Sequence, residues 1–329
     1  MLTTLTLAIA LVLDGIAGQP PHMPWYTAMT EASHLRLAGK YAAAEARYRE
    51  AVREASKEEP AVASHLGASL NDLAMVCAAE GKYREAETLY LRSIAVWEVA
   101  QETINLAVAF SNLAGTYSAL NQPGRAEAYY RKALELLPGD SAELASPMNN
   151  LAALLMRTSS GPESLVEAEE LLHHSIAIYK QWDVADASST GPLLNLGELE
   201  RRRGNAAQAE ALARQALTIL EARLPAGHPN IAAAVNNLGA AISAQGRYSE
   251  AEPLLKRALD MRVAALGPGH PRVADTLAAY AILLRAAHRN KEAKKIEARA
   301  MAIASSDARE NQNDAMVEWK ALSKAYSAR

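Results

Sequence analysis

The feature that most constrains the fold of this chain is a segment of about 42 residues that occurs seven times. An alanine beside a glutamate marks the second half of each copy and recurs at steps of 42, 40, 42, 41, 42 and 42 residues. A chain with this period is expected to fold as a stack of small helical units. The marker residues are Ala44, Ala86, Ala126, Ala168, Ala209, Ala251 and Ala293.

The residues that follow each marker alanine keep a constant character. Four residues on, the side chain is bulky in most copies, seven residues on it is always small, and eight residues on it is always apolar; the second copy has Tyr90, Ser93 and Ile94 at these places. Offsets of 4, 7 and 8 share one face of an α-helix. The second half of each copy is therefore predicted to be an amphipathic helix.

A preceding helix is indicated by a leucine or tyrosine 13 residues before the marker in five copies. In the fourth copy, Leu151 lies 17 residues before Ala168, and the extra residues fall in the segment TSSGPESL (158–165), which is predicted to be a loop. Glycines between the halves suit the left-handed conformation that ends a helix. These glycines are Gly39, Gly81, Gly204 and Gly246.

Each copy is thus predicted to be a helix–turn–helix that cannot bury its own apolar face. Burying one leucine or tyrosine side chain contributes on the order of 1.5–3 kcal/mol, and that gain requires the next copy to be stacked upon it. The predicted fold is an all-α solenoid of about seven repeats over residues 22–304.

These columns resemble the tetratricopeptide repeat, and the 42-residue period with the turn LGPGHP (266–271) resembles the variant found in kinesin light chains. The small residues of the family motif correspond to Ala74, Ala86 and Ser93 in the second copy, and to Gly239, Ala251 and Ala258 in the sixth. The resemblance implies a right-handed superhelix with a concave groove. Residues 305–329, with Trp319, Leu322 and Tyr326 at helical spacing, are predicted to form a C-terminal capping helix.

The N-terminal segment differs from the repeats. Residues 1–19 resemble a secretory signal peptide, although they contain no Lys or Arg, and the apolar run from Leu2 to Leu13 is too short to span a bilayer. This predicts an exported protein, periplasmic or secreted, without a stable membrane span. The alternatives are a start codon assigned too early and an apolar helix that packs on the fold, and the protein is then expected to be cytoplasmic.

Composition and motifs favour no enzymatic function. The net charge of −3 gives no indication of the basic surface that a nucleic-acid-binding protein needs. The single cysteine, Cys77, excludes an internal disulfide framework. The sequence contains no glycine-rich phosphate loop, nucleophile elbow or zinc-protease signature. We therefore predict no catalytic residues, no metal site and no cofactor.

The histidines and the cysteine also favour structural roles. His173 and His174 are adjacent and point about 100° apart on a helix, so they cannot chelate one metal ion together. His228 and His270 occupy matching positions before a proline, where they are expected to hydrogen-bond a helix end. Cys77 falls in an apolar column and is predicted to be buried.

One polar column is less simply explained. The residue before the apolar anchor of the first helix is Asp or Asn in five successive copies, although Asn is a poor helix-interior residue. The resemblance implies that this column lines the concave groove and contacts the main chain of a bound peptide. The alternative is that these side chains bond to the neighbouring repeat and only hold the stack. The column contains Asp72, Asn112, Asn150, Asn195 and Asn237, and Asn71, Asn149 and Asn236 precede three of them.

Specificity for a partner would need more than these amides. A hydrogen bond contributes about 0.5–1.5 kcal/mol net, so five of them can hold a peptide main chain but not select its sequence. The arginines of ERRRG (200–204), Arg202 among them, are either a solvated helix end or a contact for an acidic ligand.

Together these features predict a non-enzymatic interaction scaffold that binds an extended peptide or a partner helix in the groove. The alternative function is self-assembly through the C-terminal helix that contains Trp319. The sequence leaves the oligomeric state open.

Overall fold

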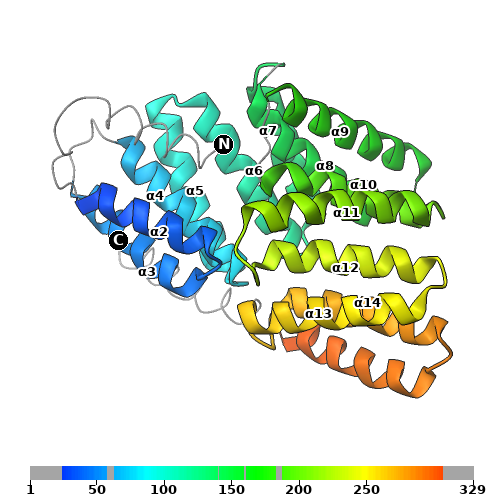
Figure 1. Cartoon of the computed structure of the whole chain (residues 1–329). Helices are drawn as coiled ribbons and strands as arrows, with labels where there is room; N and C mark the ends of the chain where they lie inside the picture. The colour runs from blue at the N-terminus through cyan, green and yellow to red at the C-terminus, as the bar shows by residue number, and fades with distance from the viewer. Residues whose placement is uncertain (1–23, 58–62, 140, 159–160, 183–186, 307–329) are drawn as a thin grey trace. The chain divides into compact units, whose positions relative to one another are not determined.

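The computed structural model describes residues 24–57, 63–139, 141–158, 161–182 and 187–306, which are almost entirely α-helical and contain no β-strand (Figure 1). The predicted signal peptide (1–19) lies outside the described residues, as does the predicted capping helix from residue 307 onward, with Trp319, Leu322 and Tyr326. Among the described helices, none combines the length and the apolar character that crossing a membrane requires.

Seven helix–turn–helix pairs follow one another along the described residues. We call the first helix of a pair its A helix and the second its B helix. The A helices are α2 (Pro24–Leu37), α4 (Ala63–Ala79), α6 (Thr103–Ala119), α8 (Ala145–Thr158), α10 (Thr190–Arg202), α12 (Pro229–Ala244) and α14 (Pro271–Ala286). The B helices are α3 (Tyr41–Ala55), α5 (Tyr83–Ala100), α7 (Pro123–Leu136), α9 (Pro162–Gln181), α11 (Ala206–Arg223), α13 (Tyr248–Leu266) and the helical residues 290–306. Two 3₁₀-helices, η2 (Ala142–Leu144) and η3 (Ala187–Ser189), precede α8 and α10.

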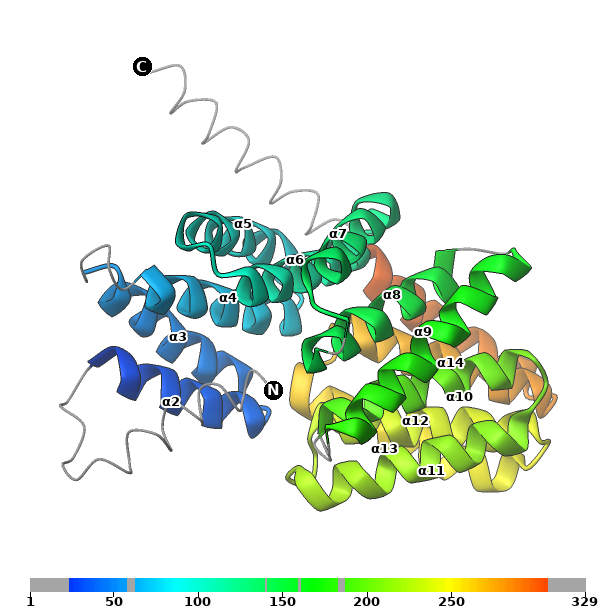
Figure 2. The same ribbon diagram turned by 90° about the horizontal axis from the view of Figure 1, so that it is seen from above.

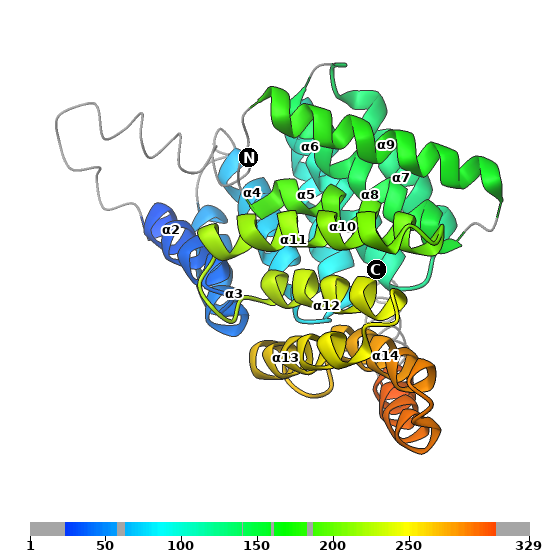
Figure 3. The same cartoon turned by 45° about the vertical axis from the view of Figure 1, so that its right-hand side comes forward.

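The chain divides into two compact units. The first comprises residues 1–80 and 85–183, and the second comprises residues 81–84 and 184–329. Within each unit the helices stack in chain order, as Figure 2 shows for α2 to α7 and Figure 3 for α10 to α14. Each A helix also packs against the next A helix of its unit, for example α4 on α6 and α12 on α14. This arrangement confirms the predicted all-α solenoid of helix–turn–helix repeats.

The marker alanines lie in the packed interior between the helices. All seven are buried, with at most 2% of their surface exposed. Small residues seven positions later serve the same purpose: Ser93 donates a hydrogen bond to the carbonyl of Gly67 (2.8 Å) and Ser175 to that of Ala145 (2.6 Å). The sequence columns are thus the contact lines between the helices.

In four pairs, the turn between the A and B helices contains a glycine in the left-handed conformation, as predicted. Gly39, Gly81, Gly204 and Gly246 have φ between 73° and 89°, which is the left-handed region that glycine adopts without strain. The fourth pair differs from the prediction. Residues 158–165 were expected to be a loop, but α9 begins at Pro162, because proline suits the first turn of a helix, where its missing N–H leaves no bond unmade.

Ion pairs join the B helices of some neighbouring repeats at one register. Five residues after the marker stands an arginine, and one residue before the next marker stands a glutamate, which gives Arg49–Glu85 (2.6 Å), Arg131–Glu167 (3.0 Å) and Arg214–Glu250 (3.6 Å). All of these side chains are partly exposed, and pairs of this kind contribute about 0–1 kcal/mol. They add little to the stability that apolar burial provides.

His228 and His270 hydrogen-bond the helix ends, as predicted. The Nδ1 atom of His228 accepts the backbone N–H of Asn230, and that of His270 accepts the N–H of Arg272, both at 3.1 Å. Each imidazole is 7% exposed and precedes the proline that begins α12 or α14. The two histidines are therefore N-caps, a position usually occupied by Ser, Thr, Asp or Asn.

The cap can be tested by replacing His228 with residues that keep or remove the acceptor. We expect His228→Ala to lower the free energy of unfolding by about 1 kcal/mol, the usual cost of losing an N-cap, and His228→Asn to lower it less. Urea unfolding followed by far-UV circular dichroism measures both. Equal losses in the two variants would show that the packing of the imidazole matters and the cap does not.

Arg262 is a buried charge of the second unit that lacks a full set of partners. It is 7% exposed, and its Nη1 donates to the carbonyl of Arg272 (2.5 Å) and to Thr276 Oγ1 (2.8 Å), while its Nε has no partner among the described residues. Burial lowers the pKa of this guanidinium to about 10, although the charge of Asp275 acts in the opposite direction. The folded state therefore disfavours the charged form of this side chain.

Replacing Arg262 by an apolar side chain of similar length should stabilise the protein. A pKa of about 10 in place of 12.5 corresponds to about 3 kcal/mol of unfavourable free energy at neutral pH, which Arg262→Met removes at the cost of two hydrogen bonds. We expect the melting temperature to rise. Arg299→Met, at an exposed position of the same unit, is the matched control. A fall in melting temperature specific to Arg262→Met would show that its hydrogen bonds outweigh the burial of its charge.

Candidate peptide-binding face

The A helices carry the candidate site on the side that they do not bury. In α12, the residues that retain exposure recur at helical spacing, as Ala233, Asn237, Ala240 and Ala244, while Leu238 and Ile242 between them are buried. Four residues of the predicted polar column lie on this side at the same register, Asn112 on α6, Asn150 on α8, Asn195 on α10 and Asn237 on α12, whereas Asp72 on α4 is buried. We call this side of the A helices, within each unit, the A face.

In the first unit, the column side chains bond to one another. Asn71 Nδ2 donates to Asp72 Oδ1 (3.2 Å), and Asn112 Nδ2 donates across to Asn71 Oδ1 (3.0 Å), which links α6 to α4. Asn149 Nδ2 donates to Asn150 Oδ1 (3.1 Å) within α8. The Asn112–Asn71 bond therefore agrees with the alternative prediction, in which the column side chains join neighbouring repeats.

In the second unit, the corresponding bonds are longer. Asn236 Nδ2 donates to Asn237 Oδ1 (3.3 Å), and Asn237 Nδ2 donates to the carbonyl of Leu194 on α10 (3.4 Å). The Oδ1 atom of Asn236 is buried and accepts no hydrogen bond from the described residues. Asn195 is half-buried on α10.

The predicted site residues fall into a buried group and a half-buried group. Asn71 and Asp72 are buried, at 3% and 8%, so their side chains belong to the core more than to the face. Asn112, Asn150 and Asn237 are half-buried, as are Asn149 and Asn236, and a ligand has better access to them. Sequence reasoning did not foresee this difference, because all of these residues share the same columns.

Two of these amides keep hydrogen-bonding capacity. Among the described residues, the side chain of Asn112 makes one hydrogen bond, which it donates from Nδ2, so its Oδ1 can still accept. The side chain of Asn150 also makes one, which it accepts at Oδ1, so both N–H groups of its Nδ2 can still donate. Asn112 and Asn150 lie on α6 and α8, which pack against each other. Neighbouring helices of the first unit therefore present one acceptor and one donor group.

Arg202 is exposed at the C-terminal end of α10 and is part of a charged cluster. Glu198 accepts hydrogen bonds from Arg202 Nε (2.8 Å) and from Arg201 Nε and Nη2 (both 2.8 Å). Burial opposes ionisation of Glu198, but the bonds from the two arginines prevail and lower the pKa of its carboxyl group. With Glu198 ionised, the three side chains carry a net charge of +1.

A small hollow lies beside this cluster, between α10, α11 and α12. Its lining includes Leu194, Glu198, Arg201 and Asn237, and its volume of about 10 Å³ is near the minimum for one water molecule. A ligand side chain does not fit into it. A ligand on this part of the A face must therefore lie over the surface.

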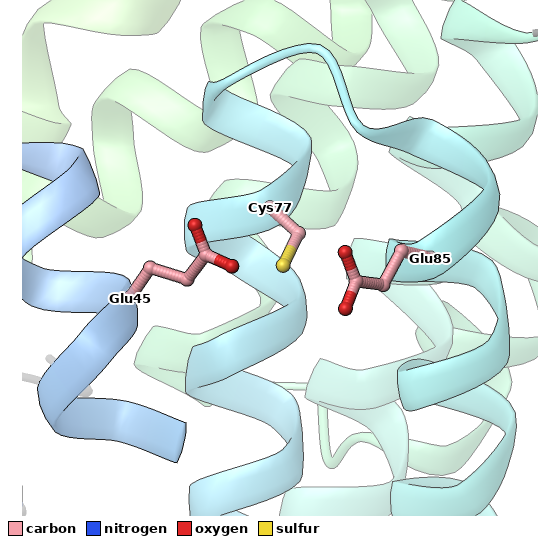
Figure 4. Close-up of side chains that lie close together, drawn as sticks. All are labelled: Glu45, Cys77 and Glu85. Atoms are coloured by element: carbon pink, nitrogen blue, oxygen red, sulfur yellow. The ribbon is translucent and has the colours of Figure 1, made fainter. Parts of the chain in front are cut away.

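A second cluster, which the sequence did not predict, surrounds the cysteine of the first unit. Figure 4 shows Cys77 Sγ between the carboxyl groups of Glu45 and Glu85, and the three ligand atoms lie within 4.8 Å of one another. Arg49 already bonds to both carboxylates, with Nη2 2.5 Å from Glu45 Oε1 and 2.6 Å from Glu85 Oε1. Arg49 offsets one of the two carboxylate charges, and Cys77 is fully buried, as predicted. The cluster thus contains an ion-pair network between two repeats, beside a core residue.

Comparison with known proteins identifies the repeats. The family model described as tetratricopeptide repeat matches residues 65–139, 189–262 and 230–306, which is more than half of the chain. A search of the curated proteins gave no match.

Several solved structures resemble the chain. A Rap protein complexed with Competence and Sporulation Factor is 16% identical, with 93% of each chain covered and a TM-score of 0.62. The quorum sensor NprR from B. thuringiensis is 12% identical, covering 90% of this chain and 92% of its own, with a TM-score of 0.53. BtubC (BKLC) from P. vanneervenii is 24% identical, covering 70% of this chain and 92% of its own, with a TM-score of 0.49. At these identities the likeness establishes the fold alone.

Asp72 offers a test of the polar column, because it is the one carboxyl group in a column of amides. Burial raises its pKa, although the charge of Arg36 and the hydrogen bond from Asn71 act in the opposite direction. Asp72→Asn matches the other four repeats and removes the buried charge. We expect it to raise the melting temperature at pH 7 by about 2–4 °C, the shift that 1 kcal/mol produces in a unit of this size.

The pH dependence of this effect follows from the sign of the shift. Since the folded-state pKa is raised, the wild-type protein gains stability relative to Asp72→Asn as the pH falls through that pKa, and the gain is complete below the unfolded value of about 3.9. Melting curves from pH 7 to pH 3 measure the difference. A variant that is less stable at pH 7 would show that attraction to Arg36 exceeds the desolvation of the carboxylate.

Proposed function

Because this chain belongs to the tetratricopeptide repeat family, we propose that it is a non-enzymatic interaction scaffold that binds an extended peptide or a helix of a partner protein on its A face. The Rap protein of similar fold was crystallised with Competence and Sporulation Factor bound. That complex is an example of a ligand held by this fold, and the residues of the present chain carry the rest of the proposal.

The observation that carries the proposal is the unused hydrogen-bonding capacity of Asn112 and Asn150. Both side chains are half-buried on neighbouring A helices, one with a remaining acceptor and the other with remaining donors. A peptide main chain offers one N–H donor and one carbonyl acceptor per residue. The two amides therefore match an extended chain that crosses α6 and α8.

The remaining groups of the A face are suited to supporting roles. The second unit carries polar-column residues of its own, Asn195 and Asn237, and its Arg201 and Arg202 provide positive charge for an acidic side chain. Each of the preceding amides donates to the column residue that follows it and so orients that residue within the same helix; these amides are Asn71, Asn149 and Asn236. In the second unit, bonds from Asn195 and Asn237 to the main chain hold a ligand, and the charges of Arg201 and Arg202 help to select it.

The decisive variant replaces Asn112, Asn150, Asn195 and Asn237 by Ala. We expect it to lose capture of the partner from an extract of the native host while its far-UV circular dichroism stays nearly unchanged. Within the free protein the variant removes only a few half-buried side-chain bonds, such as Asn112–Asn71 and Asn237–Leu194, and it leaves the apolar contacts between the helices intact. The matched control removes three exposed polar side chains from B helix α11 (Gln208→Ala, Gln215→Ala, Thr218→Ala) and should retain capture.

Two results would contradict the proposal. If the quadruple variant still captures the partner, the A face is not the binding surface. If it instead unfolds at markedly lower urea concentration than the α11 control, the amides serve mainly to join the repeats, and any loss of capture reflects lost structure.

A further inference from the structure

The three A helices of the second unit expose different chemistry at one register. Glu198 on α10, Ala240 on α12 and Ile282 on α14 are spaced by 42 residues and occupy equivalent places on the A face. Glu198 is held by two arginines, Ala240 is half-buried and small, and Ile282 is a large apolar side chain with 63% of its surface exposed. The face thus changes from charged to apolar across three adjacent helices.

The charged end suits an anionic group. Glu198, Arg201 and Arg202 together carry a net charge of +1, and the neighbouring Arg203 is paired with Glu200 (3.3 Å) and adds no net charge. A carboxylate placed over Arg201 and Arg202 forms charge-assisted hydrogen bonds, which are stronger than those between neutral groups.

The apolar end suits a large aliphatic or aromatic side chain. Around Ile282, the exposed and half-buried residues on the same side of α14 are small or charged. Ala278 and Ala279 are small, Asp275 is acidic, and Arg285 is paired with Glu297 (2.5 Å). Between the two ends, α12 presents the small side chains of Ala233, Ala240 and Ala244 together with the short polar side chains of Asn236, Asn237 and Ser243. A ligand main chain can therefore approach α12 closely and reach both ends.

The spacing of the two ends sets the length of the ligand. Packed helix axes lie about 8–10 Å apart, so the two steps from α10 to α14 span about 16–20 Å. An extended chain advances about 3.3 Å per residue and covers this distance in about five or six residues, whereas a helix at 1.5 Å per residue needs more than about ten.

We propose that the second unit binds an extended peptide whose acidic side chain contacts Arg201 and Arg202 and whose large apolar side chain, five or six positions away, covers Ile282. This inference rests on the proposed function, since it specifies the ligand of the same face.

The test uses a library of random 12-residue peptides displayed on phage and selected on the immobilised full-length protein. We expect the selected peptides to share Asp or Glu and a large apolar residue at a spacing of five or six, in one order. For a synthetic peptide of this kind, fluorescence anisotropy should show at least a tenfold loss of affinity when the acid becomes its amide, when the apolar residue becomes Ser, or when the spacing becomes two or ten.

Protein variants locate the contacts. Arg201→Gln with Arg202→Gln should remove the preference for the acid over its amide, and Ile282→Asp should remove the preference for the apolar residue. The matched controls are Arg203→Gln, on the same helix end, and Met301→Asp, at another exposed apolar position, and both should bind like the wild type.

The outcomes separate this inference from the proposed function. The inference alone would be overturned if the selected peptides share another pattern and bind equally well after the changes at Arg201, Arg202 and Ile282. The proposed function would still stand if these peptides lose affinity for the quadruple Asn variant. A selection that enriches no peptide would overturn the inference alone, because the proposed function also covers a partner helix. Selected peptides that all bind the quadruple Asn variant as tightly as the wild type would overturn both.

Discussion

Close contact between helices at the marker alanines is the interaction on which the rest of the structure depends. Each of these residues is almost completely buried between helices. A larger side chain at such a place forces the packed helices apart, which typically costs about 1–3 kcal/mol. The bulky residues four positions later, such as Tyr48, Tyr90 and Tyr130, fill the space beside the alanines and are themselves buried. The repeated sequence therefore encodes one contact many times.

The same packing explains why one side of the A helices remains available. An A helix such as α12 is contacted by α11 and α13 and by the neighbouring A helices α10 and α14. These contacts bury Leu238 and Ile242 and leave the stripe that contains Asn237 at the surface. A side chain on that stripe can vary without disturbing the core, so it is where differences between repeats accumulate, as Glu198, Ala240 and Ile282 show.

The repeat columns could be predicted from the sequence because they reflect contacts made at a fixed register. Ala86, Ser93 and Leu113 are buried as their columns required, and Gly39 and Gly246 have the expected positive φ. The limit of α9 was missed because local composition indicated a loop, whereas Pro162 is compatible with a first helical turn. Local signals of this kind do not distinguish a loop from a helix start.

The details of the candidate site depend on three-dimensional neighbours that a column does not contain. Asp72 and Asn150 share a column, yet Asp72 is buried near Arg36 and Asn150 is half-buried. The position of Arg49 between Glu45 and Glu85 brings together residues from two repeats, and no spacing within one repeat indicates it. Sequence periodicity thus predicts which face each residue occupies but not how its polar group is satisfied.

The polar column can both hold the stack and contact a ligand, because an amide has more hydrogen-bonding groups than one internal contact uses. The Nδ2 of Asn112 donates to Asn71, and its Oδ1 can still accept a hydrogen bond. The bond that joins α6 to α4 therefore also fixes the direction of this Oδ1 atom. A preoriented acceptor loses less conformational entropy when a ligand binds than a freely rotating one. The internal bonds of the column are therefore compatible with ligand binding, and they reduce its cost.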